Sequence, residues 1–149
     1  MYKRIVWSLA LLVSIFVAVA LFAAQNVSVA QSDEAVHARR SIAINLLRAI
    51  NTAEYQYKFK RGRFADWDAL LESEEFAGRA MQGAARNDSQ LAGTHLSKCP
   101  DILPGWRLRM NVHADEQGYD VMLEDATDNS FGWAAITDER AVIRESKSI

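Results

Sequence analysis

The fold of this chain is dominated by the stretch Ser32–Phe59, which reads SDEAVHARRSIAINLLRAINTAEYQYKF. It contains no Pro or Gly, and its apolar residues recur at spacings of three, four and seven, which predicts a long amphipathic helix. These apolar residues are Val36, Ile42, Ala43, Leu46, Ala49, Ile50, Ala53 and Tyr57. Ser32 is the expected N-cap, and Gly62 is expected to end the helix behind a run of cations that suits the helix dipole.

Two shorter helices are expected after this one. Asp66 is placed to cap a short helix that carries Trp67, Leu70 and Leu71 on one side. A further helical stretch is expected from about Glu74 to Arg86, where Gly78 and Gly83 interrupt the pattern. Residues 87–98 are expected to form a loop.

Beyond Pro104-Gly105 the spacing of apolar residues changes to every second residue, which indicates strands with one buried face. Strands are predicted over residues 106–113, 119–124, 131–137 and 141–144, with turns at 115–118 and 127–130 and a connection at 138–140. A sheet with one wet face must lay its other face on something apolar, and the long helix offers the matching stripe. The sequence therefore predicts an α+β fold in which the long helix packs on a small antiparallel sheet of about four strands.

The N-terminus differs in composition from the rest of the 149-residue chain, whose net charge is −2. Residues 1–30 contain no acidic residue, and Lys3 and Arg4 precede an uncharged run over residues 5–24. We therefore divide the chain into a leader, 1–30, and one α+β domain, 31–149. The mild negative charge argues against nucleic acid as an obligatory partner of the whole surface.

Two interpretations of the leader stay open. Ser28 and Ala30 provide the small residues before a secretory cleavage site, which predicts a mature chain that begins at Gln31. Alternatively, residues 5–24 match the roughly 20 residues of a membrane-spanning helix and form an uncleaved anchor. In both cases the positive-inside rule places Lys3 and Arg4 in the cytoplasm and the domain outside it, in the periplasm or at the cell surface.

Cys99 is the single cysteine, so the domain must fold without an internal disulfide. The charge of the neighbouring Lys98 favours a lower pKa of its thiol, but Pro100 follows and no His lies nearby in the sequence. An inert thiol and a disulfide to a second chain are the two alternatives for this residue.

The order of these segments resembles that of type IV pilins and the pseudopilins of type II secretion. Residues 53–57 followed by Gly62-Arg63-Phe64 resemble the pilin region where the long helix ends among aromatic residues. Gly105-Trp106 resembles the opening of the first pilin strand, Tyr119 the start of the second, and residues 137–144 the last hairpin of a major pseudopilin. The resemblance spans about residues 35–145 and implies a non-enzymatic protein that acts through protein contacts.

The leader departs from that family. Pilins are cut after a Gly that precedes an apolar stretch with an acidic fifth residue, and residues 1–30 contain neither Gly nor an acid. A soluble or singly anchored pilin-like protein outside the cytoplasm is therefore expected, with self-association or a protein partner in place of filament assembly through the leader.

A basic and aromatic segment at the helix exit predicts an alternative role in binding DNA. Lys58, Lys60, Arg61 and Arg63 alternate with Phe59 and Phe64, a combination that binds phosphates while rings stack on bases. Arginines 39, 40 and 48 extend this basic face, and the acids at 34 and 54 dilute it. The competing interpretation is a helix end with solvated cations.

A second alternative is a calcium site. Asp125, Asp128 and Asn129 lie together in a predicted loop of the sheet, and the pseudopilin resemblance implies calcium in this part of the fold. The same residues are also common turn formers. The sequence contains no catalytic motif, no zinc spacing and no phosphate-binding Gly loop, so we expect no catalytic residues and no cofactor other than calcium.

Five aromatic residues gather near the helix exit: Tyr55, Tyr57, Phe59, Phe64 and Trp67. They are expected either to close the core at the open end of the sheet or, if exposed, to bind a partner.

Overall fold

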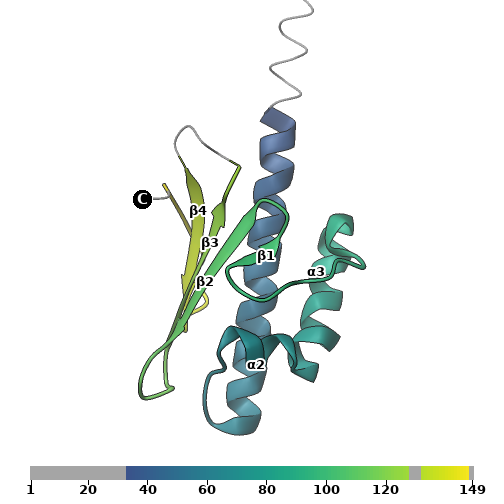
Figure 1. Ribbon diagram of the computed structural model, residues 1–149. Coiled ribbons are helices and arrows are strands. Elements are labelled where there is room, and N and C mark those ends of the chain that lie inside the picture. The colour runs from purple at the N-terminus through teal and green to yellow at the C-terminus, as the bar shows by residue number, and fades with distance from the viewer. Residues whose placement is uncertain (1–32, 128–131, 148–149) are drawn as a thin grey trace, which may run out of the picture. The chain divides into compact units, whose positions relative to one another are not determined.

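The computed structural model describes residues 33–127 and 132–147, which form helices and one antiparallel sheet (Figure 1). The chain divides into two units at Arg39/Arg40, and the described strands all belong to the second unit, Arg40–Ile149. The predicted α+β class is therefore confirmed. The predicted boundary at residues 30/31 lies outside the described residues.

Residues 33–61 are helical and are called the long helix below. From Ala43 to Tyr57 its apolar stripe is buried in the core, as the spacing predicts. Gly62 ends the helix with φ +78°, and its N–H donates to the Lys58 carbonyl oxygen at 2.7 Å. A glycine adopts this left-handed conformation without steric strain, which is why the helix stops here.

The sheet has five strands in the order β1-β2-β3-β4-β5, and each strand pairs antiparallel with the next. The strands are β1 (Asp101–Leu103), β2 (Trp106–Val112), β3 (Tyr119–Asp125), β4 (Trp133–Asp138) and β5 (Arg144–Lys147). Inward side chains align across it, with Leu108 opposite Leu123 and Leu123 opposite Ala135.

Two details of the predicted sheet are corrected. The four-strand prediction omitted β1, which has three residues and a register irregularity, so it shows no alternating pattern to detect. The last strand begins at Arg144 and not at Ala141. Asp138 stabilises the turn that leads into this strand. Its Oδ1 accepts from the Arg140 N–H at 3.0 Å, and its carbonyl oxygen accepts from the Ala141 N–H at 2.8 Å. Ala141 therefore lies in the turn, with φ +58°.

The connection between helix and sheet contains the predicted short helices. Helix α2 (Trp67–Leu71) is capped by Asp66, whose Oδ1 accepts from the Ala69 N–H at 2.8 Å. The predicted second stretch is helical, but it contains the π-helical segment η1 (Phe76–Ala80) before α3 (Met81–Asn87). The predicted loop at 87–98 contains a short 3-10 turn, η2 (Ser89–Leu91).

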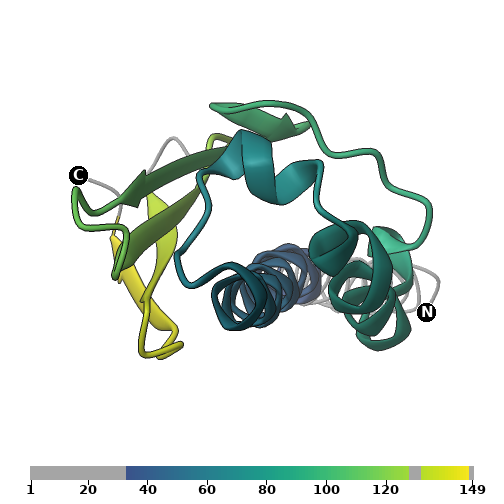
Figure 2. The same ribbon diagram turned by 90° about the horizontal axis from the view of Figure 1, so that it is seen from below.

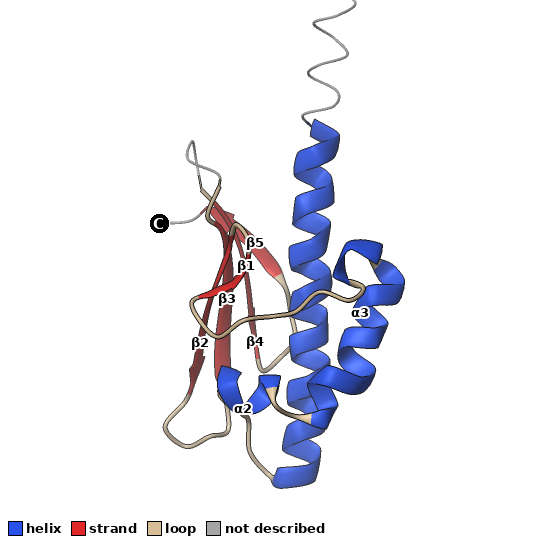
Figure 3. Ribbon diagram, turned by 45° about the vertical axis from the view of Figure 1, so that its right-hand side comes forward, coloured by secondary structure: helices blue, strands red, loops and turns tan. Residues whose placement is uncertain are grey.

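Within the second unit, the long helix lies between the sheet and α3, as the view from below shows (Figure 2). Figure 3 shows the strands as one layer beside this helix. A single hydrophobic core joins the helix residues Leu46 and Ile50 to the sheet residues Leu108 and Leu123. The helix therefore covers the apolar face of the sheet, and its opposite side is left for α3 and for solvent.

Candidate functional site

The aromatic residues at the helix exit divide into buried and exposed members. Tyr57, Phe64 and Trp67 belong to the core. Tyr55 and Phe59 lie one helical turn apart, and they are 73% and 84% exposed. The two alternatives expected from sequence thus apply to different residues of one cluster: three residues close the core, and two are presented to solvent.

The exposed pair borders a groove of about 470 Å³, which we call the aromatic–acidic groove. Its lining residues come from the end of the long helix and from the segment before η1: Tyr55, Gln56, Phe59, Lys60, Glu74 and Glu75. Residues 74–75 are also helical, so both walls of the groove come from helical segments. These walls carry two aromatic rings and two carboxylates, together with Gln56 and Lys60.

Glu75 is the buried member of this groove, with a side chain that is 3% exposed. Its Oε1 accepts from Lys60 Nζ at 2.8 Å, while its Oε2 has no hydrogen-bond partner among the described residues. The hydrogen bond from Lys60 is the main reason that the pKa of Glu75 lies below its ordinary value. Glu75 is therefore a carboxylate at neutral pH. Sequence reasoning missed this residue, because its pairing joins two side chains 15 residues apart and depends on how their segments pack.

The four cations proposed from sequence for DNA binding all contact groups of the same chain. Lys58 Nζ donates to the Gln117 carbonyl oxygen at 3.2 Å, and Lys60 Nζ donates to Glu75 Oε1 at 2.8 Å. The Arg61 guanidinium lies 4.6 Å from the centroid of the Tyr57 ring. Arg63 donates to Glu116 Oε1 at 2.8 Å. These contacts fit the competing interpretation, in which the cations lie at the end of the long helix and bind nearby groups of the same chain.

Of the three residues proposed for calcium, Asp125 is described and Asp128 and Asn129 lie outside the described residues. Asp125 Oδ1 accepts from the Thr127 N–H at 2.9 Å and from Thr127 Oγ1 at 2.6 Å, which is the turn-forming role of an Asp. Within residues 33–127 and 132–147, no three His, Cys, Asp or Glu side chains are grouped closely enough to hold a metal ion.

The leader predictions also concern residues outside the described part of the chain. These are the cleavage site at Ser28, Ala30 and Gln31 and the apolar run over residues 5–24. For the residues that the structure describes, no helix combines the length and the apolar character that a membrane span requires.

The inert-thiol alternative fits Cys99. Desolvation and the nearby Asp68 raise the pKa of its thiol to about 11, whereas the charge of Lys98 alone would lower it. Lys98 Nζ lies 3.5 Å from Asp68 Oδ2, so its charge is directed to that carboxylate. The thiol is therefore protonated and weakly nucleophilic at neutral pH.

Glu54 was expected to dilute a basic surface, and it is instead fully buried. Its Oε2 accepts from the Ala65 N–H at 3.1 Å, and its Oε1 has no partner among the described residues. Burial raises the pKa of Glu54 to about 7. A signal was present in the sequence, because position 54 continues the buried spacing of Leu47, Ile50 and Tyr57.

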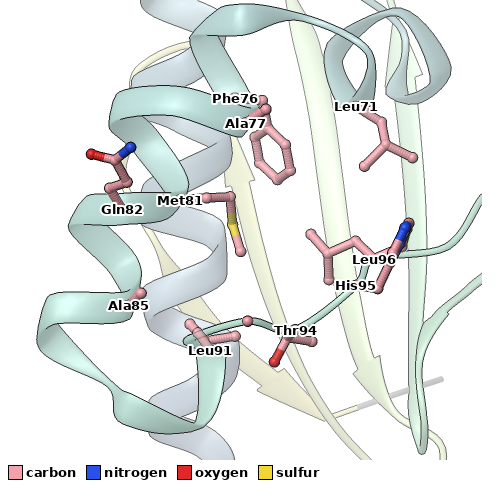
Figure 4. Close-up of a pocket in the computed structure, with 11 residues that line it drawn as sticks. Leu71, Phe76, Ala77, Met81, Gln82, Ala85, Leu91, Thr94, His95 and Leu96 are labelled. Atoms are coloured by element: carbon pink, nitrogen blue, oxygen red, sulfur yellow. The ribbon is translucent and has the colours of Figure 1, made fainter.

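A second groove, of about 470 Å³, lies between α3 and the segment that follows it (Figure 4). We call it the apolar groove, and it is lined mainly by Leu71, Phe76, Met81, Leu91 and Leu96. Two of its polar residues are engaged locally: Thr94 Oγ1 donates to the Gln90 carbonyl oxygen at 2.7 Å, and His95 Nδ1 lies 3.2 Å from the Leu96 carbonyl oxygen. Sequence reasoning missed this groove because its walls come from several short elements.

Comparison of the chain with protein-family models, with curated protein sequences and with solved structures found no match.

Proposed function

We propose that this chain is an exported, non-enzymatic protein with a pilin-like domain that acts through protein–protein contacts in the periplasm or at the cell surface. The observation that carries the proposal is the exposure of Tyr55 and Phe59, side by side on the long helix. Large aromatic side chains dominate the energetics of protein interfaces because they bury much apolar area with little loss of side-chain entropy.

The exposed pair has no evident role in holding the fold. The core at the helix exit is already closed by Tyr57, Phe64 and Trp67, and the Phe64 ring packs edge-on against Tyr119 at a centroid distance of 4.8 Å. Phe59 at 84% exposure leaves most of its apolar surface in water. Burying an exposed ring in an interface is worth roughly 1.5–3 kcal/mol, which is a direct driving force for association.

The order of elements supports the pilin-like part of the proposal. The long helix ends at Gly62, short helices follow, and an antiparallel meander closes the domain. Trp106 opens β2 and Tyr119 opens β3, at the positions that the resemblance uses. The leader, with two cations before the apolar run 5–24, supports export.

Photocrosslinking tests the proposed contact. The full chain carrying benzoylphenylalanine at position 59 is expressed in its native host, and the control chain carries the same probe at Val142, another exposed apolar residue at 48% exposure. We expect a discrete adduct from position 59 that is lost when Tyr55→Ala is added, and none from position 142. Equal adducts at both positions, or none at 59, would contradict the proposal.

A further inference from the structure

The aromatic–acidic groove contains a charged group with unused binding capacity. Glu75 is nine-tenths buried and borders the groove, yet only one of its two oxygens has a partner among the described residues. An ionised carboxylate accepts hydrogen bonds at both oxygens, and leaving a buried one half-satisfied is unfavourable. Glu75 therefore favours a second donor.

The present donor, Lys60, is a surface side chain. It is 58% exposed and delivers one ammonium group to Glu75 Oε1 at 2.8 Å. Because more than half of this flexible side chain lies in solvent, holding its ammonium at one oxygen costs side-chain entropy and lowers the net gain from the contact. The groove thus already receives a cation, and that cation belongs to a side chain that a stronger ligand is able to displace.

The rest of the lining also suits a cation. Glu74 adds a second acidic residue to the lining, where Lys60 is the base, and the charge of Arg61, which lies outside the lining, also acts on Glu75. The exposed rings of Tyr55 and Phe59 offer π faces that attract ammonium and guanidinium groups. Carboxylates beside aromatic rings match an arginine better than a lysine, because guanidinium bonds both oxygens of a carboxylate and stacks flat on a ring.

We propose that the aromatic–acidic groove binds an arginine side chain presented by an apolar segment of a partner protein. The guanidinium displaces the Lys60 ammonium at Glu75 Oε1 and bonds both oxygens once the Glu75 side chain turns its buried Oε2 toward the groove, while the apolar neighbours of the arginine cover Tyr55 and Phe59. This assignment rests on the proposed function, since it names the chemistry of the partner at the same surface.

Lys60 and Glu75 then have opposite roles, so substitutions of the two residues should change the affinity for the arginine in opposite directions. Lys60 competes with the incoming arginine, so its removal strengthens binding. Glu75 is the acceptor, so its neutralisation weakens binding. If the Lys60–Glu75 ion pair only held the fold, both substitutions would change the affinity in the same direction.

The probes are two peptides, acetyl-Leu-Arg-Leu-amide and its counterpart with citrulline, which keeps the shape of arginine without its charge. Each is titrated into the ¹⁵N-labelled full chain, and shifts of the Gln56 side-chain amide, a lining group, are followed. We expect the arginine peptide to bind about tenfold more tightly than the citrulline peptide. Lys60→Met should tighten its binding severalfold, and Glu75→Gln should abolish the preference.

Lys98→Met and Glu72→Gln are matched controls at exposed positions outside the groove, and neither should change the affinity. Glu74→Gln, at an exposed lining residue, is expected to weaken binding and provides a second test if Glu75→Gln does not fold. Circular dichroism confirms that each variant is folded before titration.

Four results would overturn the inference, of which the first three are equal binding of the two peptides, no shift up to about 10 mM peptide, and weaker binding by Lys60→Met. Concentration-dependent shifts at Gln56 without peptide would also overturn it, by making a second copy of this chain the occupant. The crosslink at position 59 reports on the proposed function separately. If that crosslink persists while the arginine preference is absent, only the assignment of the partner's chemistry fails.

Discussion

Asn51 on the long helix and Tyr119 on β3 are joined by a buried hydrogen bond, in which the Tyr119 hydroxyl donates to Asn51 Oδ1 at 2.8 Å. Asn51 Nδ2 in turn donates to Thr137 Oγ1 on β4 at 3.0 Å. One amide thus connects the helix to two neighbouring strands. Because buried polar groups favour the one arrangement that satisfies them, this network fixes how the helix lies along the sheet.

Tyr119→Phe should lower the free energy of unfolding by about 1 kcal/mol, because it removes the hydroxyl that donates to the buried Asn51 oxygen and leaves the ring in place. Thr52→Ala, at an exposed position on the same helix, should change it by less than about 0.5 kcal/mol. Urea denaturation monitored by circular dichroism gives both values. An unchanged midpoint for Tyr119→Phe would show that the network does not contribute to stability.

Glu54 predicts a pH dependence of stability. Its pKa is raised from 4.5 to about 7 in the folded protein, so the unfolded chain loses this proton at lower pH than the folded one. The contribution of Glu54 to the free energy of unfolding is present in full below pH 4.5 and is lost as the pH rises to about 7. The total loss is roughly 3 kcal/mol.

Glu54→Gln should remove that decline, because an amide keeps an oxygen to accept from the Ala65 N–H and does not ionise. We expect the variant to be more stable than the wild type at pH 8 and close to it at pH 4.5. Denaturant titrations at these two pH values are sufficient. A difference between the two proteins that is the same at both pH values would refute the assignment.

Two glycines should respond to alanine with opposite signs. Gly62 has φ +78°, which disfavours any side chain, so Gly62→Ala should destabilise the protein by about 1 kcal/mol. Gly83 lies within α3, and a Cβ there meets no atom within 4 Å, so Gly83→Ala should stabilise it by about 0.5–1 kcal/mol. Thermal unfolding of the two variants provides the comparison, and a shift of the same sign in both would contradict these conformational assignments.

The leader makes a prediction about the mature protein. If Ser28 and Ala30 direct cleavage, the chain recovered from the native host begins at Gln31 and lies in a soluble fraction outside the cytoplasm. N-terminal sequencing and intact mass after cell fractionation measure this directly. An intact Met1 in the membrane fraction would instead assign residues 5–24 as a permanent anchor.

Those features that depend on local periodicity were predictable from the sequence. The apolar stripe of the long helix, its end at Gly62, the Asp66 cap and the alternation in β2 and β3 all follow from neighbours within a few residues. Strand β1 was missed because a three-residue strand carries too short a pattern, and its place depends on pairing with β2.

The groove could be predicted only in part. Aromatic residues at the helix exit were visible, but which of them face solvent depends on the direction the chain takes after Gly62. The partners of Glu75 and Glu54 depend on packing between segments, so a local reading placed no weight on Glu75 and assigned Glu54 to the surface. The cations were recognised as a group, whereas the structure gives each its own partner.

Removal of the exposed rings of Tyr55 and Phe59 should impair binding without destabilising the fold. Tyr55→Ala and Phe59→Ala together should change the free energy of unfolding by less than about 1 kcal/mol, because both rings lie mainly in solvent. Phe64→Ala, at a buried ring of the same cluster, should cost about 3 kcal/mol or more. Chemical denaturation compares them. A large loss in the double variant would mean that the pair supports the fold.

The most direct measurement is the size at which this chain elutes when it is extracted from its native host. The wild type, the Tyr55→Ala/Phe59→Ala variant and a Val142→Ala control are each expressed from the native gene, extracted gently and separated by gel filtration. We expect the wild type and the control to elute in an assembly larger than a single chain, and the double variant to elute as a single chain. Elution of all three proteins in the same assembly, or of the wild type as a single chain, would contradict a role in protein contacts through Tyr55 and Phe59.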